Sequence, residues 1–538
     1  MFNSQNTEND VAIAHKPPCD EGVLSAGTCE QPVDKSTGRW VLLATILGSS
    51  MAFIDSTVVN VALPTLQRDF SATASGVQWV VQAYALLLAA LILTGGSLGD
   101  RLGRRKVFVI GTVLFTVASV WCGAAPNLEQ LIAARALQGV GGALLVPGSL
   151  AIISATFADS ERGKAIGTWS GFTAITSAIG PVLGGWLVEY LSWRAVFLIN
   201  IPLAIVVVIV ALWRVPESRD EDATAPIDWL GASFITLGLG GLVFGLTEAA
   251  GQGWGAATTW ISLIVSGLAF AGFIITELRV ASPMVPFNLF RSSTFSGANL
   301  LTLFLYASLS GALYFVPFNL IQVQGYSSTE AGAALLPMIL ILSGLSRWAG
   351  GLIDHFGARL PLVVGPLAAA AGFALFALPG VGGSYWVTVF PATVVLGVGM
   401  AITVAPLTTA VMSAVDERHS GLASGINNAV SRAAGVLAIA VFGILMAVTF
   451  DRQLDDRTQD IPLDGGGRAE LQANRDQLAA MSPPAGLDGA AAASFTDSVD
   501  RSFVAGYRLI MLVGAALAVA SGVAAALLIR NPMPKASG

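Results

Sequence analysis

Four runs without a single charged residue follow one another early in the chain, at residues 77–99, 107–128, 136–158 and 165–188. A helix needs about 20 residues to cross a hydrocarbon layer of roughly 30 Å. Only 12% of the residues are charged, against about 25% in an average soluble domain. The runs therefore predict a polytopic membrane protein and exclude a soluble one.

Counting all such runs, including those that one ionisable residue interrupts, gives fourteen predicted spans between residues 40 and 529. The uncharged stretch 360–415 forms two of them, because the Pro and Gly residues in 378–384 are typical of a turn. The count depends on taking 229–247 and 249–276 as two spans, a division for which the sequence leaves an alternative.

The distribution of Lys and Arg predicts the orientation, because loops that carry them stay in the cytoplasm. With the N-terminus inside, most of the 28 Lys and Arg residues lie on cytoplasmic segments, whereas Arg68 and Arg194 lie in short external loops. Residues 1–38 have no apolar core of a secretory signal. We expect a multi-pass protein of the bacterial cytoplasmic (inner) membrane with both termini cytoplasmic. Its net charge of -6 indicates no nucleic-acid partner.

An internal repeat predicts the architecture. Three segments recur with nearly the same offset: 70–76 as 326–332, 96–105 as 350–359, and 139–141 as 397–399. Such a repeat is typical of transporters whose halves rock around a midplane site. We expect an all-α membrane protein with two pseudo-symmetric six-helix bundles, at 39–214 and 281–530, two inserted helices at 215–280, and tails at 1–38 and 531–538.

The most specific motif, GxLxDRxGRR, follows the second predicted span. Its fixed residues are Gly96, Asp100, Arg101, Gly103, Arg104 and Arg105, and its second-half repeat keeps Gly350, Asp354, Gly357 and Arg359. A carboxylate such as Asp100 can face a neighbouring helix N-terminus. The arginines are predicted to hold a cytoplasmic gate by charge pairs.

The fifth predicted span carries the pattern GxxxxxxxxGPxxGG, formed by Gly171, Gly180, Pro181, Gly184 and Gly185. Proline removes a helix hydrogen bond, and glycines allow helices to approach closely. The pattern predicts a bend and a tight interface between the halves.

These motifs resemble those of the major facilitator superfamily, and within it the fourteen-span drug:proton antiporters of the EmrB/QacA type. The resemblance covers essentially all of residues 40–529. It implies alternating access, and it favours export over uptake because the fifth-span pattern is associated with exporters. It also implies that the arginine of the fourth-span pattern RxxQG, here Arg135 with Gln138 and Gly139, assists proton transfer.

Asp55 in the first span is the predicted proton-coupling acid. A carboxylate among apolar residues is costly in its charged form and indicates function. At about 1.5 Å rise per residue, Asp55 lies some 22 Å above the inner start of its span, and Arg135 lies roughly 10 Å below the outer start of the fourth. The two depths nearly coincide. The alternative is a purely structural ion pair.

The second half has arginines where some relatives that export cationic drugs have acids. We therefore expect neutral, anionic or singly cationic substrates. The candidate substrate-cavity residues are Asn60, Gln138, Tyr306, Asn319, Arg347, Asn427 and Arg432.

The predicted function is proton-driven export of small amphipathic molecules, with the lipid bilayer, the substrate and protons as partners. A lipid or siderophore exporter of the same fold, or less readily a nutrient symporter, is the alternative. The GxSxG pattern at 95–99 ends a membrane span, and no HExxH or Walker A sequence occurs. We expect no enzyme, cofactor or metal. Residues 451–502 are predicted to form a flexible external loop, the alternative being a dock for a periplasmic adaptor.

Overall fold

The computed structural model describes residues 35–219, 227–251, 253–280, 283–416 and 420–530. Fourteen helices among them are long and apolar enough to cross a membrane, from the span beginning at Thr37 to the one ending at Leu528. The predicted number of spans and the all-helical fold class are confirmed. The tails 1–34 and 531–538 lie outside the described residues.

The first half is one helical bundle. Its helices are α1 (Lys35–Asp69), α2 (Ala74–Leu102), α3 (Arg104–Ala124), α4 (Leu128–Thr156), α5 (Asp159–Tyr190), α6 (Ala195–Leu198) and α7 (Asn200–Arg214). The side chains of Thr73 and Asn127 cap the N-termini of α2 and α4, which fixes where these helices begin after short turns. Within the bundle, α4 packs against α2 and α3, and α1 packs against α5 and α7.

The second half repeats this packing. Its helices are α10 (Ser293–Phe318), α11 (Ser328–Ala334), α12 (Leu336–Gly350), α13 (Leu352–Phe356), α14 (Arg359–Phe376), α15 (Tyr385–Thr388), α16 (Phe390–Ser413), α17 (Ser420–Thr458) and α19 (Gly489–Leu528), with η1 (Phe287–Arg291) before α10 and the π-helical η2 (Asn319–Val323) after it. α16 packs against α12 and α14 as α4 does against α2 and α3. Ser327 caps α11, two residues before the repeat equivalent of Thr73.

The two inserted helices are α8 (Trp229–Gly251) and α9 (Ala257–Arg279). α8 packs against α9 and also against α2 and α17, one helix from each half. Its Leu239 and Val243 form one buried cluster with Leu86 and Ala90 of α2 and Val436 of α17. The insertion therefore covers one of the two seams between the halves.

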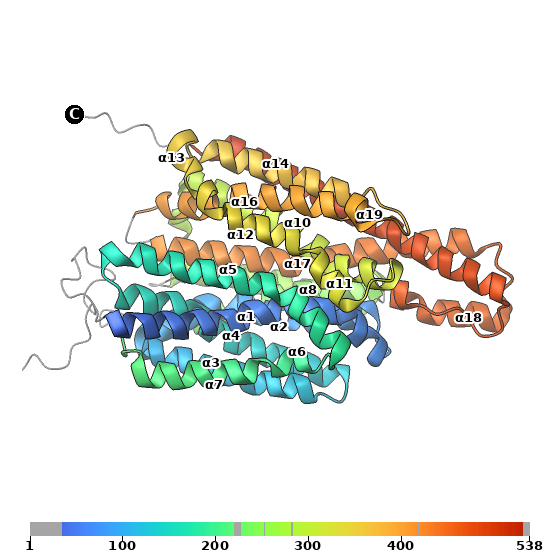
Figure 1. Ribbon diagram of the computed structural model, residues 1–538, viewed down its shortest axis with the longest axis horizontal. Helices are drawn as coiled ribbons and strands as arrows, with labels where there is room; N and C mark the ends of the chain where they lie inside the picture. The colour runs from blue at the N-terminus through green and yellow to red at the C-terminus, as the bar shows by residue number, and fades with distance from the viewer. Residues whose placement is uncertain (1–34, 220–226, 252, 281–282, 417–419, 531–538) are drawn as a thin grey trace, which may run out of the picture.

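α17 and α19 run beyond the bundle and end in a hairpin that we call the cap. It comprises the outer turns of both helices together with α18 (Gly465–Asn474) and η4 (Arg475–Ala480), and Figure 1 shows it projecting from one end. We call this the cap end, and the opposite end, where α1 begins and α19 finishes, the terminal end.

The prediction of a flexible loop at 451–502 is wrong. The polar composition of this segment suggested a loop, but two helices start in it. Asp464 caps the N-terminus of α18, and Asp488 caps the N-terminus of α19. A few buried apolar side chains of the cap, among them Leu454, Leu471 and Phe495, belong to the hydrophobic core that continues into the bundle.

Candidate functional site

Asp55 and Arg135 form a fully buried ion pair in the middle of the first bundle. Arg135 Nη1 lies 2.5 Å from Asp55 Oδ2, and the two side chains are 1% and 0% exposed. α1 and α4 bring together residues 80 positions apart. The predicted coincidence of depth is therefore a direct contact.

Two amides complete the coordination of the Asp55 carboxylate. Gln138 Nε2 donates to Asp55 Oδ1 at 2.8 Å, and Asn200 Nδ2 of α7 donates to the same oxygen at 3.4 Å. Both amides also donate to Ser119 Oγ of α3, at 3.2 and 2.9 Å. Every partner of the carboxylate is a donor, which is the arrangement that suits its ionised form.

Arg135 is held from two further sides. Its Nε donates to the backbone carbonyl of Val80 at 3.0 Å, and its guanidinium lies 4.3 Å from the centre of the Tyr84 ring. Both contacts come from α2. Protonation of Asp55 would remove the one negative charge that Arg135 contacts and leave a buried cation with dipoles alone, which is costly in an apolar interior.

Sequence reasoning found Asp55, Arg135 and Gln138 but missed Asn200 and Ser119. A lone amide inside the apolar run before Pro202 was the available signal for Asn200. Gln138 belongs to this network and is 0% exposed, so in this conformation it does not line an open substrate cavity.

The α5 glycine motif packs on the turn of α1 that carries Asp55. A Cβ at Gly180 would lie 2.0 Å from Thr57 Oγ1, and one at Gly184 would lie 2.9 Å from the Val58 carbonyl oxygen. Since real Cβ atoms do not approach so closely, only glycine allows α5 to lie this near to α1.

The same motif contacts the second half at the cap end. A Cβ at Gly185 would lie 2.3 Å from the carbonyl oxygen of Ser328, and one at Gly332 of α11 would lie 2.1 Å from that of Pro181. The backbone N–H of Thr329 donates to Glu189 at 3.1 Å. The cap ends of α5 and α11 are therefore closed against each other.

The described glycines nearer the terminal end of α5 have no such contact. Gly171 is fourteen positions before Gly185 and so faces nearly the same direction, yet a Cβ there would meet nothing within 4 Å. Gly171 thus does not make the tight interface expected of it. Along α5 the halves are closed at the cap end and apart at the terminal end. Along α2 and α17 the two halves stay in contact: Gly443 of α17 packs against Gln78 of α2, and Gly425 of α17 packs against Leu93 of α2.

The GxLxDRxGRR loop is braced within the first half. Arg104 Nε donates to Asp100 Oδ1 at 2.9 Å, and Arg105 lies 3.6 Å from Glu217. Glu217 also accepts from the backbone N–H groups of Arg105 and Lys106, at 3.0 and 3.2 Å. Glu217 follows α7 in the chain, and its contact with the start of α3 was not predicted. Among the described residues Arg104 and Arg105 form charge pairs, whereas Arg101 has no ion-pair partner, and the role of these arginines in a gate stays a prediction.

Gly103 is the strict glycine of the loop, with φ of 109° and Glu217 2.8 Å from a Cβ placed there. It makes room for the Glu217 carboxylate at the N-terminus of α3, where a negative charge is favourable. Gly96 faces only Pro147 at ordinary contact distance.

Glu217→Ala is expected to lower the free energy of unfolding by about 0.5–2 kcal/mol, the usual cost of removing a helix N-terminal acceptor. The measurement is thermal unfolding of the purified protein in detergent. Asp456→Asn is the matched control, because Asp456 is exposed and has no partner among the described residues. Equal melting temperatures for Glu217→Ala and wild type would contradict this role.

The second-half repeat of the motif keeps its turn. Gly357 has φ of 70°, and Arg359, the first residue of α14, donates to the Ala526 carbonyl of α19. Gly350 ends α12 with open space around it. The side chains of Asp354 and Arg347 lie outside the described part of the structure.

The remaining candidate cavity residues are dispersed. Asn427 donates to Asn299 and Thr302, at 3.2 and 2.7 Å, and Arg432 donates to Asn428 at 3.2 Å. Asn319 is in η2 and lines a cavity of about 20 Å³ at the cap end. Asn60 and Tyr306 are half-buried. A shared substrate cavity for these residues stays a prediction.

Comparison with known proteins agrees with this geometry. The Major Facilitator Superfamily model matches residues 45–439. The tetracenomycin C resistance and export protein of Streptomyces glaucescens is 34% identical over 518 residues, which is 95% of each chain. The multidrug resistance protein Stp of Mycobacterium tuberculosis (strain CDC 1551 / Oshkosh) is also 34% identical, over 77% of each chain.

Among solved structures, the chain is similar to a bacterial homologue of the human lysosomal transporter Spinster in an inward-facing, unoccupied conformation. The TM-score is 0.64 at 19% identity, covering 91% of this chain and 98% of the other. That likeness shows the fold. With its matching family model and fourteen candidate spans, the chain belongs to the major facilitator superfamily, and within it to the fourteen-span drug:proton antiporter family.

Proposed function

We propose that this protein exports small amphipathic drug-like molecules across the bacterial cytoplasmic membrane in exchange for protons. The observation that carries the proposal is the continuity between a buried acid and a gate. Asp55 is on the turn of α1 against which Gly180 and Gly184 of α5 pack, and the next glycine, Gly185, contacts α11 of the other half.

Coupling follows from the charge of Asp55. A proton arriving from outside neutralises the carboxylate and releases Arg135 and Gln138 from it. The turn of α1 and the glycine face of α5 then rearrange together, because their contact leaves no space for independent movement. Release of the proton to the cytoplasm restores the ion pair. In each transport cycle, the change in charge of Asp55 therefore drives the movement of α5.

The names of the relatives support a drug or antibiotic as the exported molecule, because they describe resistance and export. Export of a lipid or siderophore by the same machinery is the second candidate, since the Asp55 site carries no substrate-specific feature. We propose that the terminal end faces the cytoplasm and the cap end faces outward. An adaptor that binds the cap stays a prediction.

The direction of transport is tested in membrane vesicles. Inside-out vesicles with an acidic interior should accumulate a fluorescent drug from a chemically diverse panel, and right-side-out vesicles loaded with it should expel it. A protonophore should stop both, because the gradient supplies the energy. Concentration of the drug inside right-side-out vesicles by an inward proton gradient would overturn export in favour of symport.

A further inference from the structure

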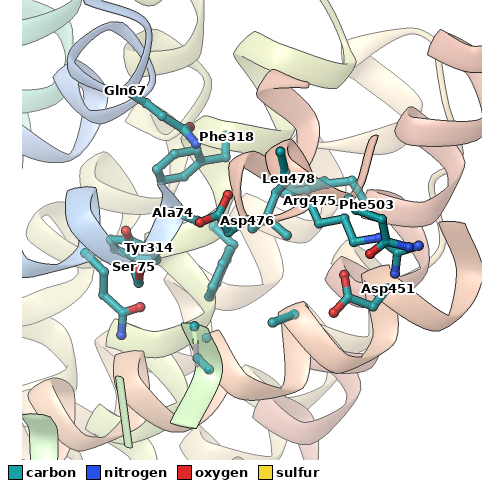
Figure 2. A pocket seen from close by; sticks show the side chains of 18 residues that line it. Gln67, Ala74, Ser75, Tyr314, Phe318, Asp451, Arg475, Asp476, Leu478 and Phe503 are labelled. Carbon is teal, nitrogen blue, oxygen red and sulfur yellow. The ribbon is translucent and has the colours of Figure 1, made fainter. Parts of the chain in front are cut away.

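A cavity of about 280 Å³ lies under the cap, at the junction of the two halves. Its walls come from α1 and α2 of the first half, α8 of the insertion, and α10, α17 and α19 of the second half, and its roof is η4 with the end of α18. Figure 2 shows side chains of these elements converging on it, with Tyr314 and Ser75 on one side and Asp451 and Arg475 on the other.

One wall of the cavity offers hydrogen-bond donors that no described residue uses. Gln78 lines the cavity, is 3% exposed, and its Nε2 has no hydrogen-bond partner. Tyr314 also lines it, is 4% exposed, and has no hydrogen bond to its hydroxyl among the described residues. A buried amide N–H₂ without a partner is costly, so this wall is suited to a ligand that carries an acceptor.

The opposite wall is negative. Asp451 lines the cavity with no hydrogen bond or ion pair among the described residues, although it lies near enough to Arg475 to interact with its charge. Arg475 is the one cation of the lining, and both of its terminal nitrogens pair with Asp455 outside the cavity. Asp476, exposed at the rim, adds a second negative charge. A cationic group is therefore favoured beside Asp451.

Between these walls the lining is aromatic, with Phe315 and Phe318 of α10 and Phe503 of α19 all buried. Flat apolar rings can pack against such side chains, and a cation near them gains further attraction. Gln67 pins the roof to the first half, because its Nε2 donates to the Gln477 carbonyl of η4 at 2.9 Å.

We propose that this cavity is a second, outer binding site for a singly cationic aromatic amine that also carries a hydrogen-bond acceptor. The amine lies at Asp451, the ring between the phenylalanines, and the acceptor at Gln78 and Tyr314. That this is the last site an exported molecule occupies before its release rests on the proposed function, whereas binding itself does not.

The test uses propranolol, a protonated aryloxy amine, and the full chain in nanodiscs. Propranolol should bind, and its N-acetylated form, which cannot carry the charge, should not. Asp451→Asn and Gln78→Leu should each weaken binding by about 10-fold or more, because each removes a charged or otherwise unmatched partner. Asp497→Asn should leave it unchanged, since Asp497 is in the cap but outside the cavity and pairs with Arg501.

Location is checked with Ala447→Cys, a lining position on α17, in a chain with Cys19→Ser and Cys29→Ser. Propranolol should protect this cysteine from a methanethiosulfonate reagent, and should do so equally when Asp55→Asn and Arg135→Gln are both present, because that pair of changes leaves no unpaired buried charge. Equal affinity of wild type and Asp451→Asn, no protection at position 447, or loss of binding in the Asp55→Asn, Arg135→Gln variant would each overturn the outer site. None of these results depends on whether the chain exports anything.

Discussion

Asp55→Asn should abolish uphill, proton-driven efflux. The substitution keeps the shape of the side chain but fixes it in the neutral state, so no proton can be exchanged as the halves alternate. Downhill exchange of substrate should persist, because it requires movement but no titration. The measurement is efflux against a concentration gradient in vesicles, compared with counterflow at equal pH. Unchanged pumping with unchanged dependence on external pH would place the coupling acid elsewhere.

The same substitution leaves Arg135 buried without its counter-ion, and breaking such a pair costs about 3–5 kcal/mol of stability. Loss of transport through misfolding must therefore be separated from loss of coupling. Asp55→Asn with Arg135→Gln removes both charges and should restore the melting temperature without restoring uphill efflux. Asp55→Glu keeps a titratable group and should retain partial pumping. Uphill efflux by the double variant would contradict the coupling role.

Gly332→Ala should hold the cap end of α5 and α11 apart. Its Cβ would lie 2.1 Å from the Pro181 carbonyl oxygen, and backbone atoms on both sides leave no flexible group to move. Overpacking of this kind costs about 1–3 kcal/mol, which would lower the population of the closed form by about 5–150-fold. Transport should fall accordingly, since the cycle must pass through that form.

The distance between spin labels on Tyr190→Cys and Tyr326→Cys, at the cap ends of the two helices, should lengthen in Gly332→Ala. Gly344→Ala is the control, because a Cβ at Gly344 of α12 meets nothing within 4 Å. It should change neither the label distance nor transport. An unchanged distance in Gly332→Ala would show that α11 does not close the cap end as described.

The features that sequence reasoning predicted are those with a short-range signal. Span number, the duplication and the Asp55–Arg135 contact follow from uncharged runs, a repeated motif and helix rise per residue. Asn200 and Ser119 were missed because an amide and a hydroxyl in an apolar helix commonly bond to their own backbone. Only the tertiary packing of α3 and α7 brings Asn200 to the carboxylate and Ser119 to the amides that bind it.

Two other features depend on distant contacts that no local pattern carries. Glu217 reads as part of an acidic linker, yet it binds the start of α3 across more than a hundred residues of sequence. The cap reads as a polar loop, yet the order of its helices depends on buried side chains such as Leu454 and Phe495, which lie on α17 and α19. The conformation, closed along α5 at one end only, was likewise beyond prediction, because a sequence specifies both states of a transporter.

Because α17 and α19 are long, the cap at their outer ends moves further than the membrane core when the second half tilts. Their 39 and 40 residues correspond to about 58 and 60 Å, twice the roughly 30 Å of hydrocarbon that a span must cross. Because both are continuous helices, any tilt of the second half swings the cap through a larger arc than it moves the membrane core, and the Gln67–Gln477 tether must break as it swings. In the orientation that we propose, an antibody fragment that clamps the cap to the first half would then arrest transport from outside the cell, without entering the membrane or competing with the drug.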